Sequence, residues 1–113
     1  MSAITTHVLD TSRGRPAAGV PIVLSQRDAS GAYVELSRGA TDADGRLRTL
    51  TEGRTLDKGV YRLVFDTAAY FAAAGVEGFY PEAAITFEVR IPSEHFHVPL
   101  LLNPFGFSTY RGS

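Results

Sequence analysis

Apolar and polar residues alternate along short stretches of the chain, and glycine or proline separates one stretch from the next. Tyr61, Leu63 and Phe65, for example, occupy every second position, which places them on one face of a strand. Turn-forming residues, such as those at 12–16 and 28–31, lie between the stretches, as is typical of short strands joined by tight connections. The pattern predicts strands at 4–10, 20–27, 33–39, 46–48, 60–66, 84–91, 95–102 and 105–111.

Residues 67–75 have a different pattern, which predicts a short helix. The segment is rich in alanine, the residue with the highest helix propensity. Asp66 or Thr67 can cap its start, and Gly75 can end it. Seven to eight strands and one helix in 113 residues predict an all-β fold, a two-sheet antiparallel β-sandwich. Residues 1–113 show no internal repeat or linker, so a single domain is expected.

The same alternation indicates where the three histidines point. In the strand predicted at 95–102, His95 and His97 lie on the face opposite the apolar one. His7 has the same position in the first strand, and Tyr110 in the last. If these strands are neighbours in one sheet, His7, His97 and Tyr110 converge on its outer surface.

Three interpretations of the histidines fit this pattern. A lone histidine on a small domain is most often a solvated surface residue. The spacing of His95 and His97 is also that of a zinc half-site, and His7 would complete a three-histidine site. An acid–base pair is the third interpretation, and alternation alone does not choose among them.

The composition excludes several classes of function. Eleven basic and 12 acidic residues give a net charge of −1, which argues against nucleic acid or an anionic membrane as a partner. The absence of cysteine excludes disulfides, a thiolate nucleophile and cysteine-ligated metals. No apolar run approaches the ~20 residues of a membrane span, and no secretory signal is visible, so a cytoplasmic protein is expected.

The acidic segment 42–45 is a weaker motif. Its sequence, DADG, is similar to the start of a calcium loop, but the further acidic ligands of an EF-hand are missing. A turn is therefore predicted. For Arg46, which follows it, the sequence alone favours a plain surface arginine.

Several separated motifs resemble, in order and spacing, those of the transthyretin-related proteins. They are HVLD at 7–10, GRPA at 14–17, DGR at 44–46, FYPE at 79–82, HFHVPLLLNP at 95–104 and STYRGS at 108–113. The ending Tyr-Arg-Gly-Ser is typical of the enzyme branch of this family, the 5-hydroxyisourate hydrolases, and distinguishes it from the hormone carrier. Phe96 stands where tyrosine is common and Asn103 where serine is common, and neither bears on the expected chemistry.

The resemblance implies a fold, an assembly and a reaction. The fold is a transthyretin-like β-sandwich, assembled as a homotetramer, a dimer of dimers with active sites in the cleft between dimers. The reaction is hydrolysis of 5-hydroxyisourate to 2-oxo-4-hydroxy-4-carboxy-5-ureidoimidazoline in urate degradation, without metal or cofactor. The zinc interpretation loses its support on this resemblance, and His95 becomes a structural or rim residue.

The resemblance also implies roles for individual residues. His97, paired with His7, is expected to activate water, and Arg46 to orient the substrate and stabilise the oxyanion. The expected catalytic residues are His7, Arg46 and His97, and the expected substrate-binding residues are His7, Arg46, Tyr110, Arg111 and Ser113. The alternative function is that of a transthyretin-like carrier, which would hold a small aromatic ligand in the channel between dimers.

Overall fold

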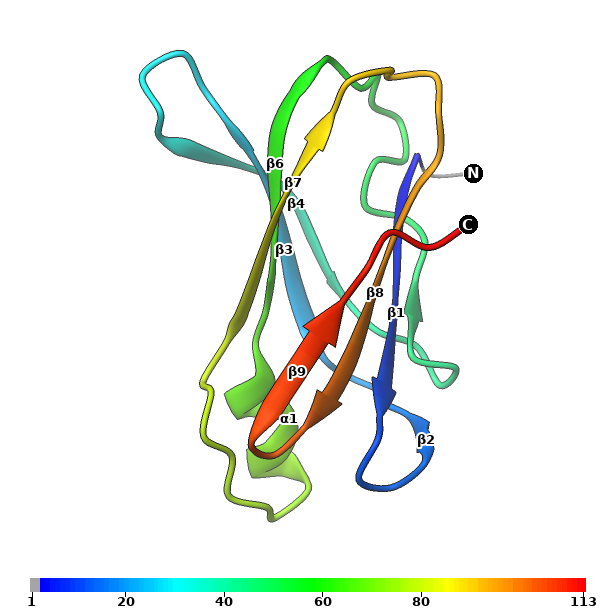
Figure 1. The fold of residues 1–113 in the computed structure, drawn as a ribbon, viewed down its shortest axis with the longest axis vertical. Helices are drawn as coiled ribbons and strands as arrows, with labels where there is room; N and C mark the ends of the chain where they lie inside the picture. Colours follow the sequence, from blue (N-terminus) through cyan, green and yellow to red (C-terminus); the bar gives the residue numbers. More distant parts are fainter. Residues whose placement is uncertain (1–2) are drawn as a thin grey trace.

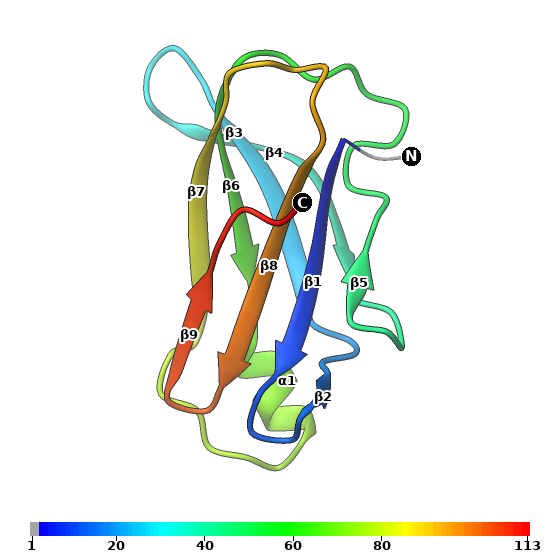
Figure 2. The same ribbon diagram turned by 45° about the vertical axis from the view of Figure 1, so that its right-hand side comes forward.

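The computed structural model describes residues 3–113, whose strands form two sheets packed face to face (Figures 1 and 2). The first sheet has the order β2 (Arg15–Pro16), β1 (Ile4–Asp10), β8 (Phe96–Asn103), β9 (Gly106–Thr109), and β5 (Arg46–Leu47) also pairs with β1. The second has the order β4 (Tyr33–Ala40), β3 (Pro21–Arg27), β6 (Gly59–Phe65), β7 (Ala83–Val89). The predicted two-sheet β-sandwich is confirmed.

The predicted helix is confirmed as α1 (Thr67–Ala73), which follows β6 at one end of the sandwich (Figure 1). Its start is capped by Asp66, whose side chain accepts a hydrogen bond from the Ala69 amide at 3.0 Å. Gly75 lies just beyond its end with φ of 68°, a left-handed backbone conformation that favours glycine and ends the helix. In residues 3–113 no helix has the length and apolar character needed to cross a membrane.

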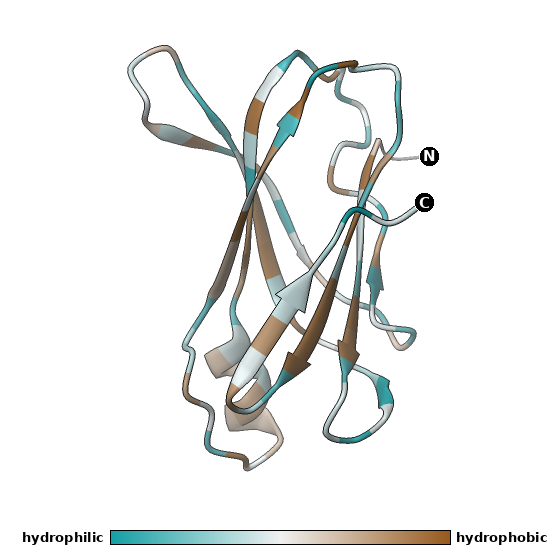
Figure 3. Ribbon diagram, viewed as in Figure 1, coloured by the Kyte–Doolittle hydropathy of each residue, from teal (hydrophilic) through white to brown (hydrophobic). Residues whose placement is uncertain are grey.

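The hydrophobic core lies between the sheets and is built from alternate residues of the strands. Figure 3 shows that hydrophobic residues are concentrated in strands such as β8. In β8, His97 and Leu101 are half-buried on the outer face, while Leu100 is fully buried. The predicted alternation therefore holds where both sheets cover a strand. The largest fully buried side chains include Tyr61, Phe65, Ile4, Ile22, Leu24, Leu63, Leu100 and Leu102.

The sheets are not wholly antiparallel, which corrects the sequence prediction. β1 and β8 pair in parallel, from Ile4 opposite Phe96 to Asp10 opposite Leu102. The connection after β7 crosses between the sheets at the end where β1 begins, so β8 runs in the same direction as β1 (Figure 2). The turn predicted at 12–16 also contains the two-residue strand β2, which pairs with the end of β1.

The last strand differs from its prediction. It ends at Thr109, and its phenylalanines do not face the core: Phe105 is 71% exposed and Phe107 37%. β9 is an edge strand, and Phe105 lies in the turn that precedes it. Phe107 instead packs edge-on against Tyr80, with ring centroids 5.5 Å apart.

A buried polar contact joins the end of β1 to α1. Asp10 is 2% exposed, and its Oδ2 accepts a hydrogen bond from the Tyr70 hydroxyl at 2.7 Å. Its Oδ1 accepts bonds from the Ser12 hydroxyl and amide at 2.6 and 3.0 Å. Burial acts to raise the pKa of Asp10, but the bonds from Ser12, Tyr70 and the Arg13 amide outweigh it, and the pKa is lowered. Burial, and then the bond to Asp10, raise the pKa of Tyr70 to about 12.

Tyr70→Phe is expected to destabilise the fold by about 1–3 kcal/mol, because a buried carboxylate loses a donor. Urea unfolding at pH 7 and fixed protein concentration measures the change, with Tyr80→Phe as the control on a more exposed ring. The lowered pKa of Asp10 means that its stabilisation is present above about pH 4 and is lost as the pH falls further. An equal loss at pH 7 and pH 3 would contradict this interpretation.

Candidate active site

Polar side chains form a row across the outer face of the first sheet. The backbone register places His7 of β1 opposite Arg46 of β5 on one side and opposite Pro99 of β8 on the other. The chain beyond β9 continues its antiparallel register along β8, which places Tyr110 opposite Pro99. The first row is therefore Arg46, His7, Pro99 and Tyr110, from four different segments.

A second row lies beside it and contains the other histidine. Thr5 is opposite His97, and an isolated bridge pairs His97 with Gly112. The Gly112 amide donates a hydrogen bond to the His97 carbonyl at 2.8 Å. The two rows place His7 and His97 on one face of the sheet, as the alternation predicts.

A cavity of about 190 Å³ lies beside these rows. Among the residues predicted for the site, it is bordered by Arg46, His97 and Ser113. His7 is not part of its lining, although its charge acts on His97. The full lining consists of Thr5, Thr6, Arg46, Arg48, His95, His97 and Ser113.

At this cavity, the surroundings of the His97 imidazole favour its neutral form. Its Nδ1 lies 2.8 Å from the Thr5 hydroxyl oxygen. Its Nε2 has no hydrogen-bond partner in residues 3–113, and no buried side-chain nitrogen there is unpaired, so Nε2 is accessible to solvent. Burial, followed by the charges of Arg46, His95 and His7, lowers the pKa of His97. At neutral pH this imidazole is therefore uncharged and able to accept a proton.

The turn at 42–45 positions Arg46, which confirms the predicted turn. The Asp42 carboxylate accepts hydrogen bonds from the Asp44 and Arg46 amides at 2.8 and 3.0 Å. Gly45 has φ of 75°, and a Cβ there would lie 2.5 Å from the Val8 carbonyl oxygen. Only glycine fits this position, since both the backbone conformation and the space exclude a side chain. The turn thus holds the start of β5 against β1.

Gly112 allows the end of the chain to pass directly over His97. A Cβ at Gly112 would lie 2.6 Å from Cδ2 of His97 and 3.2 Å from Cγ of Pro99. The His97 ring therefore leaves space only for glycine at this position of the terminal Tyr-Arg-Gly-Ser segment. Ser113 follows it at the edge of the cavity.

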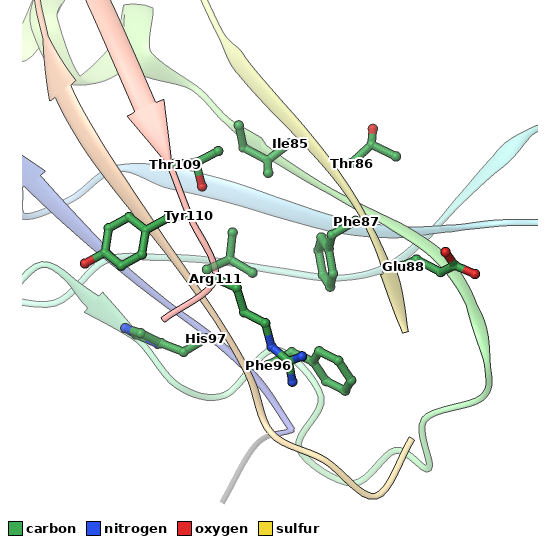
Figure 4. Close-up of a pocket in the computed structure, with 10 residues that line it drawn as sticks. Ile85, Thr86, Phe87, Glu88, Phe96, His97, Thr109, Tyr110 and Arg111 are labelled. Carbon is green, nitrogen blue, oxygen red and sulfur yellow. The ribbon is translucent and has the colours of Figure 1, made fainter. Parts of the chain in front are cut away.

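Tyr110 and Arg111 do not line this cavity. Tyr110 is 58% exposed in the first row. Together with His97, both residues line a second cleft, which faces β7 (Figure 4). There the Arg111 guanidinium lies over the Phe96 ring at 4.8 Å and donates a 3.3 Å hydrogen bond to the His95 carbonyl.

The zinc interpretation requires three side chains that can surround one metal ion. The His95 and His97 rings are stacked with centroids 6.5 Å apart, and a nitrogen of each lies beside the Thr5 hydroxyl. Within residues 3–113, no three His, Asp or Glu side chains are grouped so that they could hold a metal ion.

A family model described as the HIUase/Transthyretin family matches residues 4–112. The chain belongs to this family. The 5-hydroxyisourate hydrolase of Caulobacter vibrioides is 45% identical over 117 residues, covering 100% of both chains. The structure of Klebsiella pneumoniae 5-hydroxyisourate hydrolase is 42% identical with a TM-score of 0.87, again covering 100% of both. Sea bream transthyretin in complex with thyroxine is 33% identical with a TM-score of 0.91, covering 97% of this chain and 94% of that one.

These similarities separate the family's fold from its chemistry. The backbone matches the transthyretin at least as well as the hydrolase, whereas the sequence is more similar to the hydrolases. The distinction between branches of the family therefore lies in side chains.

Sequence reasoning did not select Thr5 and Arg48, and it placed His95 at the rim. All three line the cavity. The alternation contained a signal for two of them, because Thr5 is two residues before His7 and Arg48 two after Arg46. The contact of Thr5 with His95 and His97 required the pairing of β1 with β8, which the pattern did not indicate.

Gly112→Ala is expected to displace the His97 ring and weaken its bond to Thr5, because a methyl group would overlap Cδ2. Histidine-selective NMR should show shifted His97 resonances. The matched control is Gly106→Ala, where the new Cβ would meet Asn103 at an ordinary 3.8 Å. Identical His97 spectra in wild type and Gly112→Ala would show that the close approach does not constrain the ring.

Proposed function

We propose that this chain hydrolyses 5-hydroxyisourate to 2-oxo-4-hydroxy-4-carboxy-5-ureidoimidazoline, the activity for which its Caulobacter and Klebsiella relatives are named. The observation that carries the proposal is the pairing of a neutral imidazole, His97, with the guanidinium of Arg46 at one cavity. Hydrolysis of a cyclic amide-like bond needs a base for water and a cation beside the developing oxyanion.

The steps follow from the roles of these groups. Nε2 of His97 takes a proton from water, whose oxygen forms a bond to the ring carbonyl carbon. Arg46 stabilises the oxyanion and orients the substrate, because its charge is permanent and its donors are fixed in a plane. The carbon–nitrogen bond then breaks, and the departing nitrogen receives a proton from an imidazole. His7, beside Arg46 in the first row, contributes to substrate binding and acid–base chemistry.

The remaining predicted residues have more distant roles in this proposal. Ser113 forms part of the cavity wall. Tyr110 reaches the substrate from the first row, and Arg111 acts by anchoring the terminal segment to Glu94 and to the His95 carbonyl. Arg48 adds a further positive charge at the cavity, which favours a substrate with anionic or carbonyl oxygens.

The alternative function is that of a carrier like the transthyretin found with thyroxine. Pockets for small aromatic ligands are lined mainly by apolar side chains. The cavity here is lined by arginine, histidine, threonine and serine, including Arg46, Arg48, His95 and His97. This lining favours hydrolysis over carriage.

A homotetramer, a dimer of dimers, is part of the proposal. β7 and β9 are edge strands with unpaired backbone groups, which supports strand pairing between two copies. Leu9 and Leu101 are half-buried on the outer face next to the histidines, which supports contact between dimers there. Sedimentation equilibrium is expected to give a species of four chains, and a monomer at micromolar concentration would contradict this part of the proposal.

The activity assay generates 5-hydroxyisourate in situ from urate and urate oxidase and follows its ultraviolet decay. Wild-type protein is expected to accelerate the decay far beyond the spontaneous rate. His97→Ala should lower kcat by about 10²- to 10⁴-fold, the usual contribution of a general base, and Arg46→Gln should lower kcat/KM strongly. Arg90→Gln, on an exposed arginine paired with Glu88, is the matched control.

The pH profile tests the assignment of the base. Because His97 acts in its neutral form, kcat/KM should fall as the pH falls through the pKa of His97, below the ordinary value of about 6.5.

Two outcomes of the activity assay would contradict the proposal. Unchanged decay of 5-hydroxyisourate with folded, assembled protein would favour the carrier function. Near-normal turnover by His97→Ala would remove His97 from the role of base.

A further inference from the structure

The Thr5 hydroxyl lies between two imidazole rings. Its oxygen is 2.8 Å from Nδ1 of His97 and 3.0 Å from Nε2 of His95. Thr5 is only 5% exposed, and its place in β1 directly opposite His97 is set by the backbone register. The hydroxyl thus connects two rings that both border the cavity, and of the two His95 is the more exposed to solvent.

A hydroxyl group has one proton and two lone pairs, which couples the states of the two rings. When Thr5 donates to His95, it accepts from His97, whose proton is then on Nδ1 and whose Nε2 is free to act as a base. When Thr5 donates to Nδ1 of His97, it accepts from His95, and the proton of His97 is on Nε2. Because the hydroxyl has only one proton to donate, at least one of the two ring nitrogens beside it must carry a proton when both are hydrogen-bonded to Thr5.

We propose that Thr5 and His95 form a proton relay that carries a proton between Nδ1 of His97 and solvent during the reaction. This inference rests on the hydrolytic function proposed above. When Nε2 of His97 takes a proton from water, the Nδ1 proton passes to Thr5, the Thr5 proton passes to Nε2 of His95, and His95 releases its Nδ1 proton to solvent. When Nε2 gives its proton to the departing nitrogen, the same path runs in reverse and restores Nδ1–H.

The charges around His97 explain why a relay is useful. Arg46 and Arg48 on the β5 side and His7 on β1 are cationic or can become so. A positive His97 would face these groups in a partly buried position, whereas the relay keeps His97 neutral throughout. The acidic side chain nearest in sequence, Glu94, is paired with Arg111.

His95 is suited to the outer end of the relay. It is solvent-exposed, so a positive charge there is stabilised by water. The Arg111 guanidinium bonds to its backbone carbonyl, which holds the start of β8 beside Thr5. Thr5 and His95 are therefore positioning residues that act through His97, and neither is required to touch the substrate.

The structural half of the proposal is tested by ¹⁵N NMR of the histidine rings in the assembled protein at pH 8, without substrate. Wild type and Thr5→Ser are expected to keep the Nδ1–H form of His97, because both have a hydroxyl acceptor. Thr5→Val should shift His97 towards the Nε2–H form. An unchanged tautomer in Thr5→Val would overturn the proposal, whatever the enzyme's activity.

The kinetic half uses the 5-hydroxyisourate assay. Thr5→Val and His95→Gln are expected to lower kcat by about 10- to 100-fold with little change in KM. The loss in kcat is smaller than the full contribution of acid–base catalysis, because His97 itself is still present. Thr5→Ser should stay near wild type. Thr86→Val is the matched control, because Thr86 is a strand threonine on the second sheet whose hydroxyl accepts a hydrogen bond from Arg62 and contacts neither histidine. His95→Gln isolates proton transfer, since glutamine can bond Thr5 but cannot pass a proton on.

Chemical rescue separates a relay from a merely structural role. Free imidazole is expected to restore turnover to His95→Ala and to leave Thr5→Val unchanged, because the hydroxyl step is still missing. Normal kcat in Thr5→Val or His95→Gln, or a His95→Ala defect that imidazole does not restore, would overturn the relay. Wild-type protein without hydrolytic activity would instead refute the proposed function, and the NMR comparison would still decide whether Thr5 sets the tautomer of His97.

Discussion

The parallel pairing of β1 with β8 is the constraint on which the rest of the site depends. Its register places Thr5 beside His97 and His7 beside Pro99, and β5 adds Arg46 on the other side of β1. Because side chains alternate along a strand, a shift of one residue would turn His97 into the core and Val98 out to the surface. The buried residues of both strands exclude that shift, so core packing and site geometry have one cause.

Close backbone approach on both sides keeps this arrangement rigid. The turn ending at Gly45 holds β5 against the Val8 carbonyl, and Gly112 lets the terminal segment cover the His97 ring. Neither position has space for a side chain, and Gly45 also has a left-handed backbone conformation. A site whose imidazole is clamped in this way keeps its orientation without reorganisation during a reaction, which is the physical basis of preorganised catalysis.

The electrostatics of the site follow from the same packing. Arg46 of β5 and His97 of β8 meet at one cavity together with Arg48 and His95, and burial is the largest cause of the lowered pKa of His97. The result is a neutral imidazole at the same cavity as a permanent cation, Arg46. The comparison with transthyretin shows that the family backbone is compatible with a different ligand, so this function depends on which side chains occupy the outer face.

Local sequence was sufficient for most of the strands, for the helix and for the face on which each histidine lies, because alternation, helix propensity and turn chemistry are short-range properties. The sequence also carried the terminal motif that indicates the enzyme branch of the family. It did not determine the parallel pairing of β1 and β8, the exposure of Phe105 or the contact of Thr5 with two imidazoles. Those features depend on which strands become neighbours and where a sheet ends, and only the packing of residues distant in the chain decides that.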